Sequence, residues 1–240
     1  MKSSISGDPP ISSPSVASTM NDEPEFAEAL ASDRFIKIYV GEGQPFLVQQ
    51  LLLESLSDYC VRALKRDTFS EGIHGELRIE GDDRRTWQAL LHWLFKGVLP
   101  SQVEDDPDLL IDLWIVGDKY GVEALHNDAM YALLLHINTK QDDKALSLVT
   151  IKKGIDGTAP GTVMRRLLAE ETIRAMYGKE PASYEDFVTW NAVGFVSDVL
   201  RAKDSYGAQG YQILSRFLKK SALWKEFMLA GGGLGRVRPL

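Results

Sequence analysis

Four histidines and a single cysteine are the side chains of this chain best suited to metal binding or proton transfer. His126 and Asp128 lie two positions apart on one predicted helix, so they face different ways and do not make an acid–base pair. A metal site would need ligands gathered from distant elements, because the histidines follow no HExxH spacing and have no cysteine companions. We expect no catalytic residue, no metal and no cofactor. The four histidines are His74, His92, His126 and His136.

The glycine-rich end of the chain is its nearest approach to a nucleotide-binding motif. Residues 231–235 imitate a phosphate loop, but no strand pattern precedes them and no helix fits before Leu240. The chain also lacks a Gly-x-Ser-x-Gly elbow, a Walker loop and a complete dinucleotide-binding fingerprint. We therefore expect no enzyme, and an enzyme without a recognised motif is the least favoured interpretation.

The charge and hydropathy of the chain argue against nucleic acid and membrane as partners. Its net charge of −7 repels phosphate unless a local basic face overrides it. No apolar run approaches the ~20 residues that cross a bilayer. The basic residues form small doublets, for which we expect solvated helix faces: Lys152-Lys153, Arg165-Arg166 and Lys219-Lys220.

Cys60 is the lone cysteine, so the chain has no intramolecular disulfide. Lone cysteines fit a reducing compartment. The first residues do not show the basic, apolar and small-residue order of a signal peptide. We expect a cytoplasmic or nuclear protein, or one found in both.

Alternating apolar residues predict three short strands. Residues 35–40 place their even positions on one face, and residues 45–48 resume the alternation after the turn residues 41–44. The two segments therefore predict a β-hairpin. Residues 76–80 predict a third strand with one apolar face.

Three amphipathic helices are predicted after the third strand. Asp82 or Asp83 caps the first, which ends before Gly97; Asp106, followed by proline, caps the second, which Gly121 ends. The third follows at once. Their apolar stripes are Trp87, Leu90, Leu91 and Leu94; Leu110, Leu113, Trp114 and Gly117; and Val122, Leu125, Ala129, Ala132 and Leu133.

The regions outside this block differ in composition. Residues 1–24 are rich in serine and proline and are predicted to be disordered, and residues 25–31 predict one short helix. Residues 140–229 predict an all-helical extension, and residues 230–240 a flexible glycine-rich tail.

Three helices are predicted in the extension. Thr162 caps the first, Ser183 with Asp186 begins the second through a capping box, and residues 211–229 form the third. Their aromatic and aliphatic stripes favour packing onto the rest of the chain over an open partner groove. The stripes are Met164, Leu167, Leu168 and Ala175; Phe187, Val188, Phe195 and Val199; and Leu214, Phe217, Leu218 and Trp224.

Three segments together resemble the BTB/POZ domain, a protein-interaction domain. They are FLVQQLLLESLSDYCVRALKRDTFSEG, DDRRTWQALLHWLFKG and DLLIDLWIVGDKYGVEALHNDAM. The resemblance implies an α+β fold over residues 33–138, in which helices cap a small mixed sheet. A fourth segment, IKKGIDGTAPGTVMRRLLAEETI, is similar to one that follows the domain in many fungal BTB proteins. It implies a helical extension without assigning it a function.

The BTB resemblance implies one partner surface at Phe69-Ser70-Glu71. This tripeptide resembles the hydrophobic-x-Glu element by which some BTB proteins bind a cullin scaffold and act as substrate adaptors of a ubiquitin ligase. Phe69 would enter an apolar pocket and Glu71 would orient the loop by hydrogen bonding. The alternative is that Phe69 anchors the loop before the third strand and Glu71 caps it, since anchors are commoner than binding hot spots.

The resemblance also implies self-association through the first strand and the first helices. A homodimer or larger oligomer is expected if this surface is open, and a monomer if residues 51–64 simply pack inward. A scaffold or transcription-linked regulator with no ligase role uses the same fold, so the fold does not choose between the two functions. The residues expected in the self-association surface are Phe35, Ile36, Ile38, Leu52, Leu56 and Tyr59.

Overall fold

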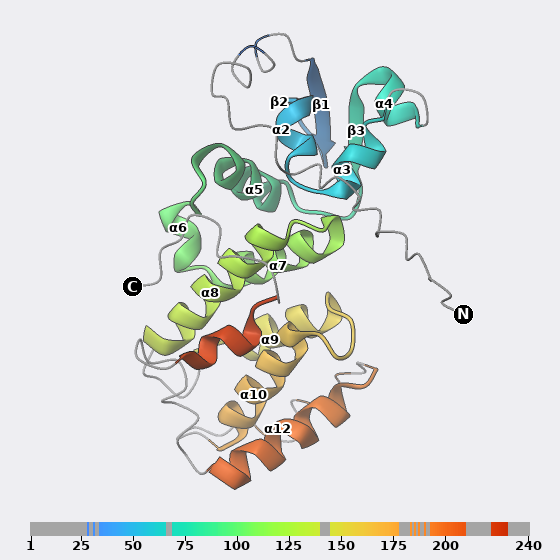
Figure 1. Ribbon diagram of the computed structural model, residues 1–240. Helices are drawn as coiled ribbons and strands as arrows, with labels where there is room; N and C mark the ends of the chain where they lie inside the picture. Colours follow the sequence, from blue (N-terminus) through green and yellow to red (C-terminus); the bar gives the residue numbers. More distant parts are fainter. Residues whose placement is uncertain are drawn as a thin grey trace, which may run out of the picture.

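The chain folds as a mixed α+β protein in which a three-stranded sheet lies at one end of a mostly helical body (Figure 1). The computed structural model describes residues 28, 31, 34–65, 69–139, 145–177, 183, 185, 187, 190, 193–209 and 222–229. Ten α-helices lie within this described part of the chain. The predicted tails, residues 1–24 and 230–240, lie outside the described residues, as does most of the helix predicted over 25–31.

The sheet has the strand order β2-β1-β3. Strand β1 (Phe35–Val40) pairs antiparallel with β2 (Phe46–Gln49), with Ile36 opposite Val48 and Lys37 opposite Leu47. The predicted hairpin is therefore confirmed, and Gly41 and Gly43 take positive φ angles in its turn. Strand β3 (Glu76–Ile79) pairs parallel with β1 on the other side. The apolar face of the sheet is buried at Ile36, Ile38, Val40, Val48, Leu77 and Ile79.

Three short helices connect β2 to β3: α2 (Gln50–Glu54), α3 (Asp58–Ala63) and α4 (Ser70–His74). The last two are tightly joined, because a Cβ atom at Gly72 would lie 2.1 Å from the carbonyl oxygen of Lys65. Gly75 ends α4 at a φ of 69° and turns the chain directly into β3. The absence of a side chain at Gly72 thus lets α4 lie close to the end of α3, and the positive φ of Gly75 lets the chain turn from α4 into the sheet.

The helices after β3 begin and end where the sequence predicts. Asp83, not Asp82, caps α5 (Arg84–Lys96), Asp106 caps α7 (Pro107–Tyr120), and Gly97 and Gly121 end them in left-handed conformations. Helices α6 (Ser101–Glu104) and α8 (Glu123–Thr139) complete this block. The apolar stripes are confirmed, except that Leu94 is only half-buried.

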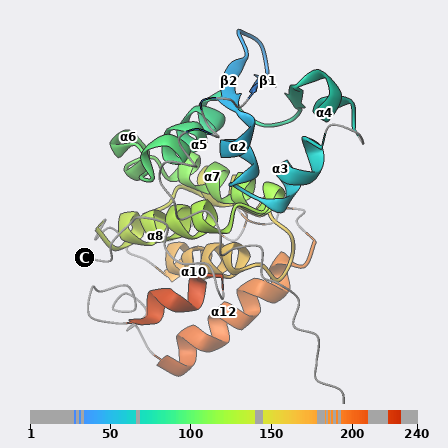
Figure 2. The ribbon, with the colours of Figure 1, turned by 45° about the horizontal axis from the view of Figure 1, so that its top comes forward.

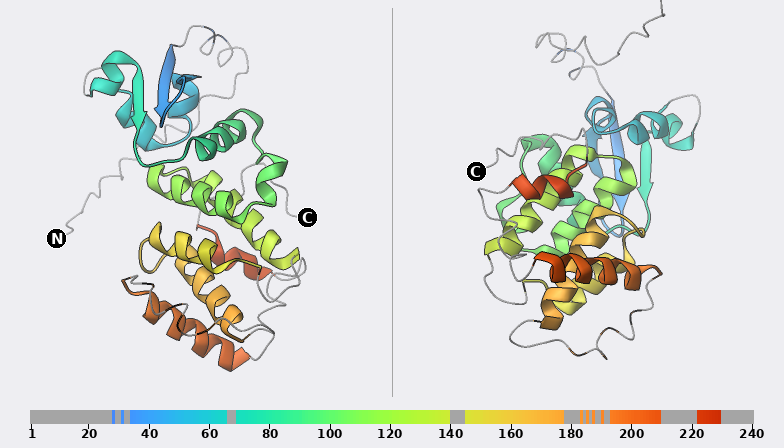
Figure 3. Two further views of the ribbon diagram at one scale, coloured as in Figure 1. Left: turned by 180° about the vertical axis from the view of Figure 1, so that it is seen from behind. Right: turned by 60° about the horizontal axis from the view of Figure 1, so that its bottom comes forward.

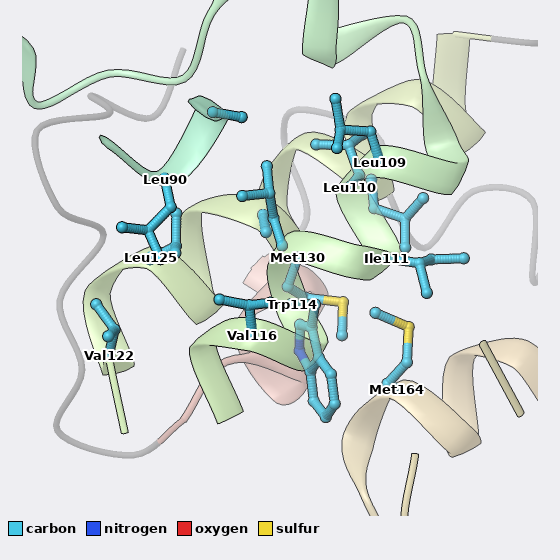
Figure 4. Close-up of a cluster of buried hydrophobic side chains, with 14 of the residues drawn as sticks. Leu90, Leu109, Leu110, Ile111, Trp114, Val116, Val122, Leu125, Met130 and Met164 are labelled. Atoms are coloured by element: carbon cyan, nitrogen blue, oxygen red, sulfur yellow. The ribbon is translucent and has the colours of Figure 1, made fainter. Parts of the chain in front are cut away.

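Helices α7 and α8 form the centre of the core (Figure 4). They pack closely at Gly117, where a Cβ atom would lie 3.0 Å from the backbone of His126. Trp114, Leu125 and Met130 are essentially inaccessible to solvent. Figure 4 also shows Met164 of the extension beside this cluster, so both halves of the chain contribute to one continuous core.

The extension consists of α9 (Leu148–Asp156), α10 (Val163–Tyr177), α12 (Phe195–Gln209) and the 3-10 helix η3 (Ala222–Phe227). Helix α9 packs against α7 at Gly154 and Gly157, whose ideal Cβ atoms would come within 3.3 Å of Ile111 and 2.5 Å of Ile115. Helix α12 lies on α10 at the end of the molecule away from the sheet (Figure 3).

Two predictions for the extension need correction. The helix expected to carry both Phe187 and Val199 does not continue through residue 194, because Gly194 takes a φ of 78° and α12 begins only at Phe195. The helix expected over 211–229 is a 3-10 helix at residues 222–227, while residues 210–221 lie outside the described part of the chain. The predicted cap at Thr162 is confirmed, since its hydroxyl accepts the N–H of Arg165 at 3.3 Å.

Candidate protein-binding surfaces

Helix α4 presents an apolar face to solvent at an outer corner of the molecule, beside α3 (Figure 2). Phe69 is 50% exposed and Ile73, one turn further on, is 60% exposed. The opposite side of α4 is held in place, because the Arg34 guanidinium donates to the Gly72 carbonyl at 2.6 Å and to Gln50 Oε1 at 2.6 Å. The exposed pair therefore stands on a fixed support, which favours a binding role.

Glu71 lies in the first turn of α4 and is half-buried. Its Oε2 accepts a 3.0 Å hydrogen bond from the Ser70 hydroxyl, and its backbone carbonyl accepts the Gly75 N–H at 2.9 Å. No cation pairs with the Glu71 carboxylate among the residues that the structure describes. A carboxylate with spare acceptor capacity thus lies between Phe69 and Ile73.

The two interpretations of Phe69 make different demands on its burial. A loop anchor should be buried, yet half of the Phe69 surface is exposed. A binding side chain should be exposed before its partner arrives. The exposed fraction of Phe69 therefore fits the partner interpretation better than the anchor interpretation.

The residues expected in the self-association surface divide into two groups. Ile36 and Ile38 are completely buried beneath the sheet, so they cannot contact a second copy of the folded chain. Leu52 and Leu56 are half-buried against the core, whereas Phe35 is 59% and Tyr59 38% exposed. Strand alternation explains the difference between Phe35 and the two isoleucines, since odd positions of β1 face outward.

The outer face of the sheet carries a second exposed apolar pair, Phe35 and Leu47, of which only Phe35 was predicted. Leu47 is 59% exposed and lies diagonal to Phe35, because Phe35 is paired with Gln49, two residues along β2. Sequence reasoning missed Leu47 and Ile73. The alternation of β2 and the four-residue spacing from Phe69 could have found them.

Asp82 joins the start of α5 to the end of α7. Its carboxylate accepts hydrogen bonds from the Tyr120 hydroxyl at 2.6 Å, Lys119 Nζ at 2.7 Å and Trp87 Nε1 at 2.9 Å. Burial alone raises the pKa of Asp82, but these donors outweigh it and the net pKa is lowered. The Tyr59 ring packs against the Tyr120 ring at a tilt of 60°, with ring centroids 5.1 Å apart. The cluster links α3, α5 and α7, which is a structural role.

Burial and nearby acidic groups also raise the pKa values of two tyrosine hydroxyls, Tyr120 and Tyr59. The pKa of Tyr120 is raised by burial and then by its hydrogen bond to ionised Asp82. The pKa of Tyr59 is raised by burial, followed by Cys60, Glu71 and Asp82. Both hydroxyls therefore stay protonated, so neither acts as a base at neutral pH.

His126 and Asp128 have separate partners, in agreement with their predicted placement on different faces. Asp128 accepts the Trp93 indole N–H at 2.7 Å, and the His126 ring lies against Trp114 with centroids 4.1 Å apart. Burial lowers the pKa of His126 to about 4 despite the nearby Asp118. His126 is consequently a neutral core residue at physiological pH.

The basic doublets are not uniformly solvated as predicted. Arg165 is 2% exposed, pairs with Asp198 at 3.3 Å and donates to the carbonyl of Val193 at 2.8 Å. The prediction for Arg165 was wrong because α12 and the turn before it cover this face of α10. Lys153 pairs with Asp112 at 2.7 Å, and Lys219-Lys220 lie outside the described residues.

A cleft of about 520 Å³ opens between the start of α5 and helices α7 and α9. Its acidic residues include Asp82, which binds Lys119, and Asp112, which binds Lys153. Burial raises the pKa of Asp112 even though Lys153 lies beside it. Within the described ranges, no three histidine, cysteine or acidic side chains converge in a way that could hold a metal ion.

No protein-family model matches the sequence, and no curated protein matches it. Among the described helices, none combines the length and apolar character needed to span a membrane. Exposed apolar pairs are the features from which function is argued, among them Phe69–Ile73 on α4 and Phe35–Leu47 on the sheet.

Proposed function

We propose that the chain is a non-enzymatic protein-interaction module of the BTB/POZ type, and that its α4 surface binds a cullin scaffold as a ubiquitin-ligase substrate adaptor. The observation that carries this proposal is the half-exposed Phe69, beside the exposed Ile73 and the half-buried Glu71. The hairpin followed by a parallel third strand and capping helices supports the BTB assignment, because the resembling family has a small mixed sheet.

Phe69 and Ile73 would enter an apolar pocket on the partner, and Glu71 would accept hydrogen bonds from it. Side chains buried at the centre of an interface often contribute at least ~2 kcal/mol each, which is about a 30-fold change in affinity. Part of the α4 backbone is already held in the free chain, because Arg34 donates to the Gly72 carbonyl at 2.6 Å and Gly72 packs closely on the backbone of Lys65. A pre-organised surface loses less entropy when its partner docks.

Binding of the host's own cullin to Phe69→Ala tests the proposal. We expect at least ~30-fold weaker binding with an unchanged melting temperature. Val149→Ala is the matched control, because Val149 is 78% exposed but lies on α9. Val149→Ala should bind as wild type does. Folded wild-type protein that does not bind cullin would reject the adaptor role, and a lower melting temperature with normal binding would make Phe69 a loop anchor.

A homo-oligomeric scaffold, including a transcription-linked regulator with no ligase role, is the second candidate. The exposed Phe35–Leu47 pair on the outer sheet face favours it. Light scattering at micromolar concentration should then give twice the 26.7 kDa chain mass, and Leu47→Glu should restore the monomer. A monomer at every concentration would remove this candidate without affecting the cullin proposal.

A further inference from the structure

The 3-10 helix η3 and the two residues after it lie against the chain where η3 contacts both α8 and α10 (Figures 1 and 3). We refer to the surface of α8 and α10 that this segment covers as the groove. Phe227 is 1% exposed there and belongs to the common core. A 3-10 helix of six residues has little stability of its own, because its hydrogen-bond geometry is poorer than that of an α-helix. The position of residues 222–229, called the segment below, therefore depends on its contacts with α8 and α10.

Helix α10 recognises the side chains of the segment through Arg166. The Arg166 guanidinium lies 4.7 Å from the centre of the Phe227 ring and donates to Glu226 Oε2 at 2.8 Å. It also pairs with Glu170 at 3.3 Å within α10, which orients the guanidinium independently of the segment. Arg166 thus contacts two consecutive side chains, the acidic Glu226 and the aromatic Phe227.

Helix α8 recognises the main chain of the segment through Asn127. The Asn127 side-chain oxygen accepts the backbone N–H of Leu229 at 2.8 Å, although Asn127 is itself fully buried. A buried amide that binds the N–H of a segment 102 positions away accepts any residue at that point except proline. It therefore sets the register of a bound peptide without selecting its sequence at that position.

These contacts have the layout of a peptide-binding site. An apolar anchor, Phe227, lies in the centre, a partly exposed ion pair lies at the rim and a main-chain hydrogen bond sets the register. The ion pair contributes less than the anchor, because the side chains of Arg166 and Glu226 are 43% and 48% exposed. Covalent attachment gives the segment a high effective concentration beside the groove.

We propose that the groove between α8 and α10 is a peptide-binding site which the chain's own residues 222–229 occupy as an intramolecular ligand. The competing ligand is a partner segment with the pattern Glu-Phe followed by two apolar residues. It binds when it displaces the chain's own segment. This proposal is independent of the cullin surface, since the groove uses Arg166 and Asn127 and not α4.

Fluorescence anisotropy with a labelled peptide of residues 222–229 tests this site on the full-length chain. Phe227→Ala in the chain should empty the anchor position, so this variant should bind the peptide at least ten times more tightly than wild type does. A peptide that itself carries Phe227→Ala is the control and should bind at least ten times more weakly to the same variant.

A second variant covers the case in which Phe227→Ala fails to fold. Glu226→Arg changes only the rim and reverses the charge that meets Arg166. The full-length Glu226→Arg chain should bind the unmodified peptide three to ten times more tightly than wild type does. Adding Arg166→Ala to that chain should remove the gain. If neither variant binds the peptide better than wild type, residues 222–229 are fixed packing and the proposal is overturned.

Discussion

Helices α8 and α10 both bury polar side chains, but they compensate them in different ways. Helix α8 uses neutral donors, since Asp128 accepts the Trp93 indole N–H and Asn127 accepts the Leu229 backbone N–H. Helix α10 uses ion pairs, among them Arg165 with Asp198. The comparison teaches that α10 neutralises its buried polar groups with opposite charges, whereas α8 satisfies them with neutral hydrogen-bond partners.

The ion pairs of α10 also run along its length. Besides Arg165, which meets Asp198 of α12, the helix pairs Arg174 with Glu171 at 3.4 Å, and both of these side chains are nearly inaccessible. Buried pairs need a precise arrangement, because removing one partner leaves the other charge uncompensated. The stability of the extension should therefore respond to changes in charge more sharply than that of α7 and α8.

The largest expected effect is that of Arg165→Ala. Removing this buried cation leaves Asp198 with only the exposed Arg201 nearby and should lower the free energy of unfolding by about 3 to 5 kcal/mol. Arg201→Ala is the matched control, because Arg201 also approaches Asp198, at 3.7 Å, but has a 79% exposed side chain. It should cost less than about 1 kcal/mol. Equal losses in urea unfolding would remove the contrast between buried and exposed pairs.

The next effect is acid sensitivity arising from His126. Its pKa falls from 6.5 when unfolded to about 4 when folded, so between these values the unfolded state binds a proton that the folded state excludes. The contribution of neutral His126 to the free energy of unfolding is fully present above pH 6.5. It is lost on acidification, by about 3 kcal/mol near pH 4. In His126→Leu this loss should disappear from urea titrations at pH 7, 5.5 and 4. An unchanged difference between pH values would show that His126 is not its source.

The smallest effect has the opposite sign and arises in α10. Burial raises the pKa of Glu171 from 4.5 to about 7, because Arg174 compensates it incompletely and Glu170 repels it. The folded state therefore favours the protonated form. Its contribution is present below pH 4.5 and is lost as the pH rises through 7, by about 1 to 3 kcal/mol.

Glu171→Gln keeps the neutral form and should remove this loss. Urea unfolding at pH 5 and pH 8 measures the difference between variant and wild type. The exposed Glu104→Gln serves as control and should follow wild type at both pH values. If Glu171→Gln also follows wild type, α10 does not respond to pH in the direction opposite to α8.

The candidate surfaces show how far sequence reasoning reaches. The family resemblance pointed to Phe69 and Glu71, and strand alternation pointed outward at Phe35. Neither the resemblance nor the alternation could predict how exposed these side chains are, because exposure depends on whether another element covers them. The same limit explains Ile36 and Ile38, which were expected at a self-association surface but are completely buried.

The sequence alone determined the local elements of this protein. The hairpin, the caps at Asp106 and Thr162 and the helix ends at Gly97 and Gly121 follow from hydrogen bonds and backbone angles within a few residues. Only the tertiary structure decided that Arg165 is buried and that Phe227 fills a groove. Those outcomes depend on contacts between distant segments. From the sequence alone, a charged residue is expected to be exposed to solvent, because the element that covers it is not known.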